Sequence, residues 1–283
     1  MGKKKNEARY LRVQPTGPKE PVKAGCYNNP NAAKFRIIHL SDTHLCHNDY
    51  LDMIPDGDIL VHTGDFSHLN ILRYVRKEND MKNTMKELDA FFAKLPHKFK
   101  FFIAGNHEIT LDTFKRDEIQ QHLTNGVYLY RNSAEIDGVK FYGDPCTNIR
   151  GNSYARAYAI HGHLLSGRWK AIDDDVDVLL THMPPYGLQD SKGGCQDLRN
   201  EVLTRIKPKV HMFGHMHSGN GITFHDDICF SNGAMHTIHS PNVIDLYYER
   251  PKDAPDVSEI EVKVHPSDKI DNSTGPEAKC SIM

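Results

Sequence analysis

Side chains that can bind metal ions follow apolar segments at five places in this 283-residue sequence. An aspartate and a histidine end "IIHLSDTH", an aspartate ends "ILVHTGD", and an asparagine, a histidine and a glutamate end "FFIAGNHE". A histidine ends "VLLTH", and two histidines end "MFGHMH". The candidates are Asp42, His44, Asp65, Asn106, His107, Glu108, His182, His215 and His217. Each pattern alone is common, but five in a row, each after an apolar segment, indicate one shared site.

Seven of these side chains form a ligand set of two carboxylates, one amide oxygen and four imidazoles. They are Asp42, His44, Asp65, Asn106, His182, His215 and His217. Without a thiolate, the set suits Mn²⁺ first, or Fe or Zn²⁺, and not a closed cysteine-rich zinc site. Seven ligands are too many for one catalytic ion and match two ions that share a carboxylate. Two ions about 3.5–4 Å apart can hold a hydroxide between them and promote an in-line displacement at phosphorus.

Short apolar segments that precede the candidates predict the strands that position them. The segments cover residues 35–40, 58–63, 98–104, 138–143, 176–181, 209–214 and 242–248. Several are apolar throughout, as strands buried on both faces are. In open α/β sheets, sites form beyond the carboxyl ends of the strands, so these five ends are expected to meet in one pocket. Two residues at i and i+2 point to the same side of an extended chain, which lets each D-x-H or H-x-H pair converge.

Helical patterns separate the predicted strands. One apolar stripe consists of Met81, Met85, Leu88, Phe92 and Leu95, spaced for one face of a packed helix. Residues 112–123 and 198–208 predict further helices, and Pro208 ends the second. Strands that alternate with helices favour a layered α/β domain. An alternating segment at 258–264 fits one more edge strand.

The order of the motifs resembles a known family. The series D-x-H, G-D, G-N-H-E, an isolated T-H and G-H-x-H, over residues 36–217, resembles the calcineurin-like metallophosphoesterase superfamily. The segments "IPDGDILVHTGDFS", "YGDPCTN" and "DVLLTHMPPYGLQD" further resemble the metallophosphoesterase-domain-containing (MPPED) proteins, which are related to bacterial class III cyclic-nucleotide phosphodiesterases. The resemblance implies a layered metallophosphoesterase fold with two central mixed β-sheets flanked by helices.

The resemblance also implies a role for each matching position. Asp42, His44 and His217 would bind the first metal, and Asp65 would bridge to the second. Asn106, His182 and His215 would complete the second site. His107 would be the acid that protonates the leaving oxygen. Glu108 would orient a neighbouring ligand without acting directly.

The expected reaction is hydrolysis of a small or cyclic-nucleotide-like phosphodiester. A phosphomonoesterase or protein phosphatase-like activity, or a membrane-tethered scaffold with incidental catalysis, are the alternatives. Arg150 and Arg156 are candidates to contact phosphate, and Tyr154 and Tyr186 to stack on a base, although an ordinary solvated loop also explains each. The formal net charge is −2 and no stripe of Lys and Arg is present, so no nucleic-acid polymer is expected as a partner.

The two ends of the chain differ from the middle in composition. We expect a polar, basic arm at 1–33, a metallophosphoesterase domain at 34–250 and a polar tail at 251–283. The tail ends in "CSIM", a CaaX pattern that predicts farnesylation of Cys280 in a eukaryotic protein. Residues 1–23 hold seven basic and two acidic residues, and this charge would add attraction to anionic lipid. No secretory signal is evident, so the protein is expected in the cytoplasm, with peripheral membrane association through the farnesyl group and the basic arm.

Overall fold

Two mixed β-sheets form the centre of the protein. The computed structural model describes residues 22–26, 28–68, 78–149, 154–250 and 252–266. The first sheet has the order β1 (Val22–Gly25), β14 (Asn242–Tyr248), β2 (Ala33–Leu40), β3 (Ile59–His62), β4 (Phe99–Phe102) and β5 (Val127–Tyr128). Strands β2 to β5 are parallel, and β14 is antiparallel to β2. The carboxyl ends of β2, β3 and β4 therefore lie at one edge.

The second sheet has the order β12 (Gly221–His225), β13 (Ile228–Asn232), β11 (Val210–Phe213), β10 (Val178–Thr181), β7 (Val139–Asp144), β6 (Asn132–Ile136) and β15 (Lys263–His265). Strands β13, β11, β10 and β7 are parallel, and the outer strands pair antiparallel. A separate pair joins β8 (Thr147–Asn148) to β9 (Ala159–Ile160). The fold class predicted from the motifs, two mixed sheets with flanking helices, is confirmed.

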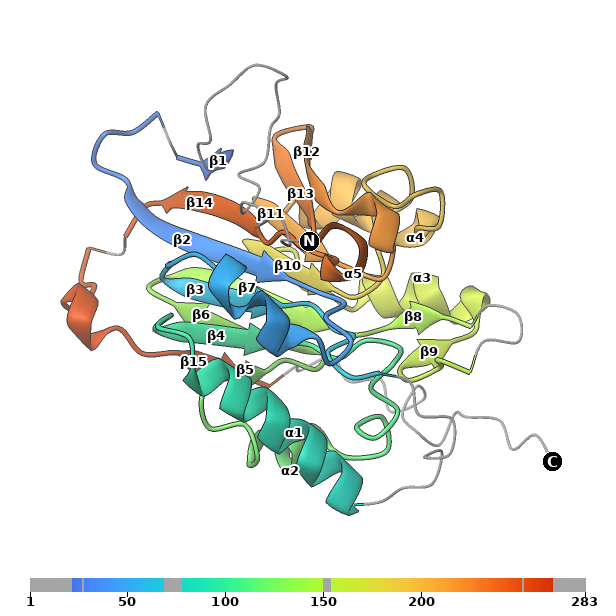
Figure 1. The fold of residues 1–283 in the computed structure, drawn as a ribbon. Coiled ribbons are helices and arrows are strands. Elements are labelled where there is room, and N and C mark those ends of the chain that lie inside the picture. Colours follow the sequence, from blue (N-terminus) through green and yellow to red (C-terminus); the bar gives the residue numbers. More distant parts are fainter. Residues whose placement is uncertain (1–21, 27, 69–77, 150–153, 251, 267–283) are drawn as a thin grey trace, which may run out of the picture.

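The buried apolar side chains form three hydrophobic clusters, one between the sheets and one on each outer face. In β3, Ile59 and Val61 belong to the cluster between the sheets, which also contains Phe141 and Leu180 of the second sheet. Leu60 points the other way, into a cluster with helix α1 (Glu78–Ala93). On the far face of the second sheet, a third cluster involves α3 (Gly162–Lys170) and α4 (Gln196–Glu201). Both faces of each central strand are thus covered, with helices on the two outer faces (Figure 1).

The helices follow the predicted stripes with different lengths. Met81, Met85, Leu88 and Phe92 are buried in α1, and Leu95 is buried just beyond its end. The prediction of one long helix at residues 112–123 is wrong. The helix α2 covers just Arg116–Gln120, and the residues before it form turns. After α4 the chain forms one π-helical turn, η3 (Val202–Ile206), which stops before the proline as expected. The helix α3 and the hairpin β12–β13 had no counterpart in the sequence prediction.

Short elements complete the described chain. They are the 3₁₀ turns η1 (His47–Met53), η4 (His217–Gly219) and η5 (Val257–Glu259) and the single-turn helix α5 (Met235–Ile238). Within the expected arm, residues 22–25 form β1, which pairs with β14. Within the expected tail, β15 pairs with β6 and Ile260 is buried, so the alternating segment supplies the edge strand.

The expectations for the two ends of the chain stay predictions. Residues 1–21 and 267–283, with Cys280, lie outside the described residues, as does Arg150. No helix in the described part of the chain combines the length and the hydropathy that a membrane span requires.

Candidate metal centre

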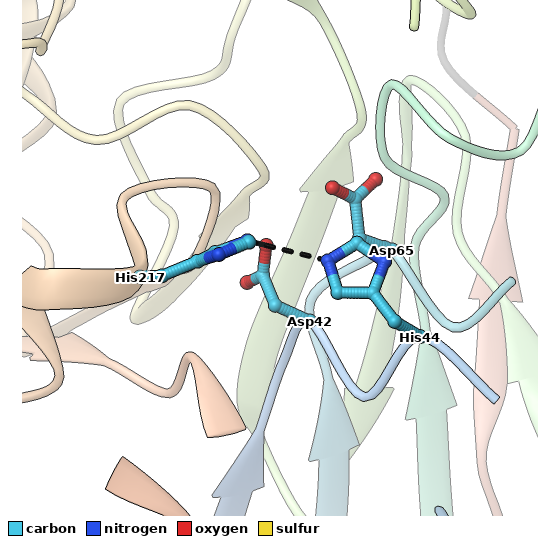
Figure 2. A group of neighbouring side chains, drawn as sticks. All are labelled: Asp42, His44, Asp65 and His217. Carbon is cyan, nitrogen blue, oxygen red and sulfur yellow. Dashed lines mark hydrogen bonds and ion pairs between the residues drawn. The ribbon is translucent and has the colours of Figure 1, made fainter. Parts of the chain in front are cut away.

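The first group of candidate ligands gathers at the carboxyl ends of β2, β3 and β11. Asp42 and His44 follow β2, Asp65 follows β3, and His217 follows β11 in η4 (Figure 2). One ligand atom from each of these four side chains lies within 4.8 Å of the others. The two imidazole Nε2 atoms of His44 and His217 are 3.2 Å apart. Because two ring nitrogens aimed at each other need a proton or a cation between them, this geometry suits a metal ion.

The second group shares a carboxylate with the first. Ligand atoms of Asp65, His182 and His215 also lie within 4.8 Å of one another. The Oδ1 atom of Asn106 is 2.9 Å from Nε2 of His182 and 2.7 Å from Nδ1 of His215. The structure thus brings all seven predicted ligands together, with Asp65 common to both groups. This arrangement has the form that two ions with a bridging carboxylate require.

Left-handed backbone at the strand ends presents these side chains. Asp42, His44, Asp65 and His215 have φ of 53°, 43°, 53° and 68°. Non-glycine residues adopt this region at a cost, and such residues cluster at functional sites. Hydrogen bonds hold the strained segments together: the His44 N–H donates to the Asp65 carbonyl at 3.1 Å, and the His215 N–H donates to the Asp42 carboxylate at 2.9 Å.

Two glycines allow the strand ends to approach this closely. A Cβ atom at Gly214 would overlap the side chains of Ser41 and Asp42. A Cβ atom at Gly105 would overlap the carboxylate of Asp65. The glycines in the "FGH" and "AGN" segments are therefore needed because backbone lies directly against ligand side chains.

Backbone carbonyls orient two of the imidazoles. Nδ1 of His44 lies 3.2 Å from the carbonyl oxygen of Ser67, and Nδ1 of His182 lies 2.8 Å from that of Thr63. A proton on Nδ1 that is donated to a carbonyl leaves Nε2 with its lone pair toward a metal. These two contacts favour the tautomer that a metal site needs.

Glu108 fastens the loops that carry the ligands. Its fully buried carboxylate accepts hydrogen bonds from the N–H groups of Asp65 (2.8 Å), Gly105 (2.5 Å) and Ser67 (2.8 Å), and from the Ser67 hydroxyl (2.9 Å). Burial and the nearby Asp65 carboxylate raise the pKa of Glu108 to about 7, against the opposing effect of the N–H donors of Ser67 and Gly105. Its expected orienting role stays a prediction.

His107 lies beside the shared carboxylate. Its Nε2 atom is 3.8 Å from Oδ2 of Asp65, and its N–H donates to Oδ1 of Asp65 at 2.9 Å. The ring packs against that of His44, with 4.6 Å between centroids, and the side chain is 22% exposed. Burial lowers the pKa of His107 although Asp65 acts to raise it. The imidazole is thus partly exposed and lies beside the carboxylate that both groups share.

The electrostatics of the site demand positive charge. Burial acts to lower the pKa of His182, but Asp65 overrides it and raises the pKa to about 9. The hydrogen bond to Asp42 raises the pKa of His217, whose Nε2 lies 3.2 Å from the Asp42 carboxylate. Two buried carboxylates thus draw protons onto neighbouring imidazoles. Divalent cations would satisfy the same carboxylates and leave the imidazoles neutral as ligands.

The family model for calcineurin-like phosphoesterases matches residues 35–219, from β2 to η4. The chain belongs to this family. The family and the ligand groups together support a metal-dependent phosphoester hydrolase.

Relatives match over most of the chain. The UPF0046 protein C25E10.12 of Caenorhabditis elegans is 34% identical over 76% of this chain and 81% of that protein. Metallophosphoesterase domain-containing protein 1 of Homo sapiens is 31% identical over 75% of this chain and 71% of that protein. Among solved structures, a 5'-nucleotidase precursor from Thermus thermophilus aligns with a TM-score of 0.39 and 11% identity, over 79% of this chain and 56% of that chain.

The described residues that were proposed to contact the substrate lie in the segment between β8 and β9 and in the segment after β10. Tyr154 is 61% exposed and Tyr186 is 47% exposed. Arg156 precedes Ala157, whose N–H donates to the Asn106 carbonyl at 3.1 Å, so the backbone there borders the second group. Their roles stay predictions.

Sequence reasoning passed over two exposed histidines that lie next to the ligands, His68 and His236. Neither stands in a recognisable motif, and no signal in the sequence singles them out.

Proposed function

We propose that this protein hydrolyses small phosphodiesters with two bound divalent metal ions, Mn²⁺ first among them. The observation that carries the proposal is the sharing of Asp65 between two groups of ligand atoms. When bound, the two ions would supply Lewis-acid activation of the phosphoryl group and of the attacking water. Preference for a diester rests on the motif resemblance to the MPPED proteins and class III phosphodiesterases.

The side chains of the protein have three tasks in this proposal. Asp65 would be a ligand of both ions, and Glu108 keeps the Asp65 backbone in place through a direct hydrogen bond. His107 would give a proton to the leaving oxygen, since its ring lies beside Asp65 and is partly exposed. Arg156 or Arg150 would contact the phosphate, and Tyr154 or Tyr186 would stack on an aromatic substituent.

A phosphomonoesterase is the alternative within the same chemistry, and a membrane-tethered scaffold is the alternative outside it. The experiment that separates them uses metal-stripped protein, to which Mn²⁺, Zn²⁺, Mg²⁺ or no metal is returned. Hydrolysis of bis-p-nitrophenyl phosphate and of p-nitrophenyl phosphate is then compared. Metal-restored activity with a higher kcat/KM on the diester supports the proposal.

Two other outcomes contradict it. A higher kcat/KM on the monoester identifies a phosphomonoesterase. If folded, metal-loaded protein turns over neither ester and a panel of cyclic nucleotides is also left intact, the scaffold is favoured.

A further inference from the structure

His236 lies against the first ligand group. Its ring centroid is 4.8 Å from that of His217 and 5.1 Å from that of His44. The ligand atoms that lie mutually close are those of Asp42, His44, Asp65 and His217, and His236 is not among them. The side chain is exposed, whereas the ring of His44 is buried. His236 therefore borders the group on its solvent side and is not one of the ligands.

The backbone fixes His236 in register with Asp42. The Ser41 N–H donates to the Gly233 carbonyl at 2.8 Å, and the Met235 N–H donates to the Ser41 carbonyl at 2.8 Å. The Met235 side chain is fully buried in the core beneath α5. Ser41 directly precedes Asp42. These two backbone hydrogen bonds therefore position both the candidate ligand Asp42 and the helix α5, which carries His236. The backbone that carries His236 is thus fixed beside the site.

His236 and His107 both pack against His44, but each reaches a different second ligand. His107 lies by Asp65, the carboxylate common to both groups. His236 lies by His217, which belongs to the first group alone. In a displacement at phosphorus, the leaving oxygen must face the acid, so it lies on the side of His107. The substituent that a diester retains is then directed to another part of the rim, where His236 offers a hydrogen bond and a flat ring face.

We propose that His236 binds the ester substituent that a phosphodiester retains during hydrolysis. This inference rests on the proposed diester function. A monoester has no retained substituent, so contact with His236 distinguishes the two substrate classes. The substituents that fit are those with an aromatic ring or a hydrogen-bond acceptor, such as a nucleoside or an aryl group.

The test compares His236→Ala with the wild-type protein, both loaded with Mn²⁺. We expect KM for bis-p-nitrophenyl phosphate to rise about tenfold with kcat nearly unchanged, as the loss of one substrate contact predicts. Kinetic constants for p-nitrophenyl phosphate should stay the same, and metal analysis should still give two ions per chain.

The matched control is His163→Ala. His163 is an exposed histidine at the same position of its helix, the second residue of α3, and its ring packs on His161. This variant should leave every constant unchanged.

Each contrary outcome has a distinct meaning. Loss of a metal ion in His236→Ala would place the residue among the ligands and overturn the inference. An equal loss on both esters, or no change on the diester, would overturn it while the diesterase function stands. If the wild-type protein prefers the monoester, the proposed function fails and the inference fails with it.

Discussion

Fully buried histidines occupy two settings in this protein, the ligand groups and the interior of the strands. His182 lies at the end of β10, 3.3 Å from the Asp65 carboxylate. His39, His62 and His211 lie within β2, β3 and β11 and are equally buried. Burial lowers the pKa of each strand histidine to about 3, whereas Asp65 raises the pKa of His182 to about 9. In the metal-free protein, the same side chain at the same depth is neutral in one place and charged in the other because of the carboxylate beside it.

Hydroxyl groups accompany the neutral histidines. The ring of His39 lies between Ser231 Oγ at 2.7 Å and Thr63 Oγ1 at 2.9 Å. Nε2 of His211 lies 2.8 Å from Thr181 Oγ1. A hydroxyl can donate or accept, so it can pair with a ring nitrogen of a neutral imidazole without drawing a charge onto it. Burial alone lowers the pKa of a histidine and keeps it neutral, whereas a buried carboxylate beside it raises the pKa and favours a bound cation.

Removal of the Asp65 carboxylate should remove the negative charge that distinguishes the ligand groups from the strand interior. In Asp65→Asn we expect kcat/KM to fall by at least about 1000-fold, well beyond the ~10–100-fold loss typical of a supporting residue. Metal analysis should show fewer than two ions per chain, because both groups lose a ligand. The control is Asp245→Asn, which removes another buried carboxylate, paired with Arg36 at 2.9 Å. Retention of two ions and activity in Asp65→Asn would contradict the shared site.

Loss of His107 should spare the metals, because it is not among the seven predicted ligands. We expect His107→Ala to lower kcat by about 100-fold, the lower range for removal of a general acid, while two ions remain bound. Steady-state kinetics with metal analysis checks both parts. The leaving group provides a sharper readout, since an ester with a leaving alcohol of low pKa needs less protonation and should lose less. An equal loss for all leaving groups would count against the acid role.

The pH dependence of metal binding follows from His182. In the metal-free protein its pKa of about 9 keeps it protonated at neutral pH, so a metal must displace that proton. Affinity should therefore rise by up to about tenfold per pH unit toward pH 9. Calorimetric titration in two buffers of different ionisation enthalpy measures the protons released. Zero release at pH 7 would show that His182 is already neutral.

A strand histidine should matter for stability and not for the site. Truncation in His211→Ala removes the contact with Thr181 and leaves a cavity between Phe213 and Phe230, whose rings lie 5.1 and 5.8 Å from it. We expect a loss of about 2 kcal/mol in the free energy of unfolding, with metal content and kcat unchanged. Urea denaturation of the metal-loaded protein gives the first quantity. A change in metal content would link the strand histidines to the site.

Local patterns in the sequence predicted the strands and the order of the ligands well. The apolar segments before Asp42, Asp65 and His182 became β2, β3 and β10, because buried parallel strands leave a continuous apolar signature. Helix α3 was not predicted, since "GHLLSGRWK" has few apolar residues and two glycines. His236 was also missed. Its proximity to His44 arises from backbone hydrogen bonds of Ser41 with Gly233 and Met235, which join segments almost 200 residues apart.

The sequence by itself determined which chemical groups are available and where each stands relative to a strand end, because local spacing depends on covalent geometry alone. Tertiary structure decided that Asp65 is common to both groups and that Glu108 fastens two loops. It also decided which buried histidines have a raised pKa in the metal-free protein and which have a lowered one. Those properties depend on distances of a few ångströms between distant segments, and electrostatic interactions at that range change with every neighbour that the fold brings close.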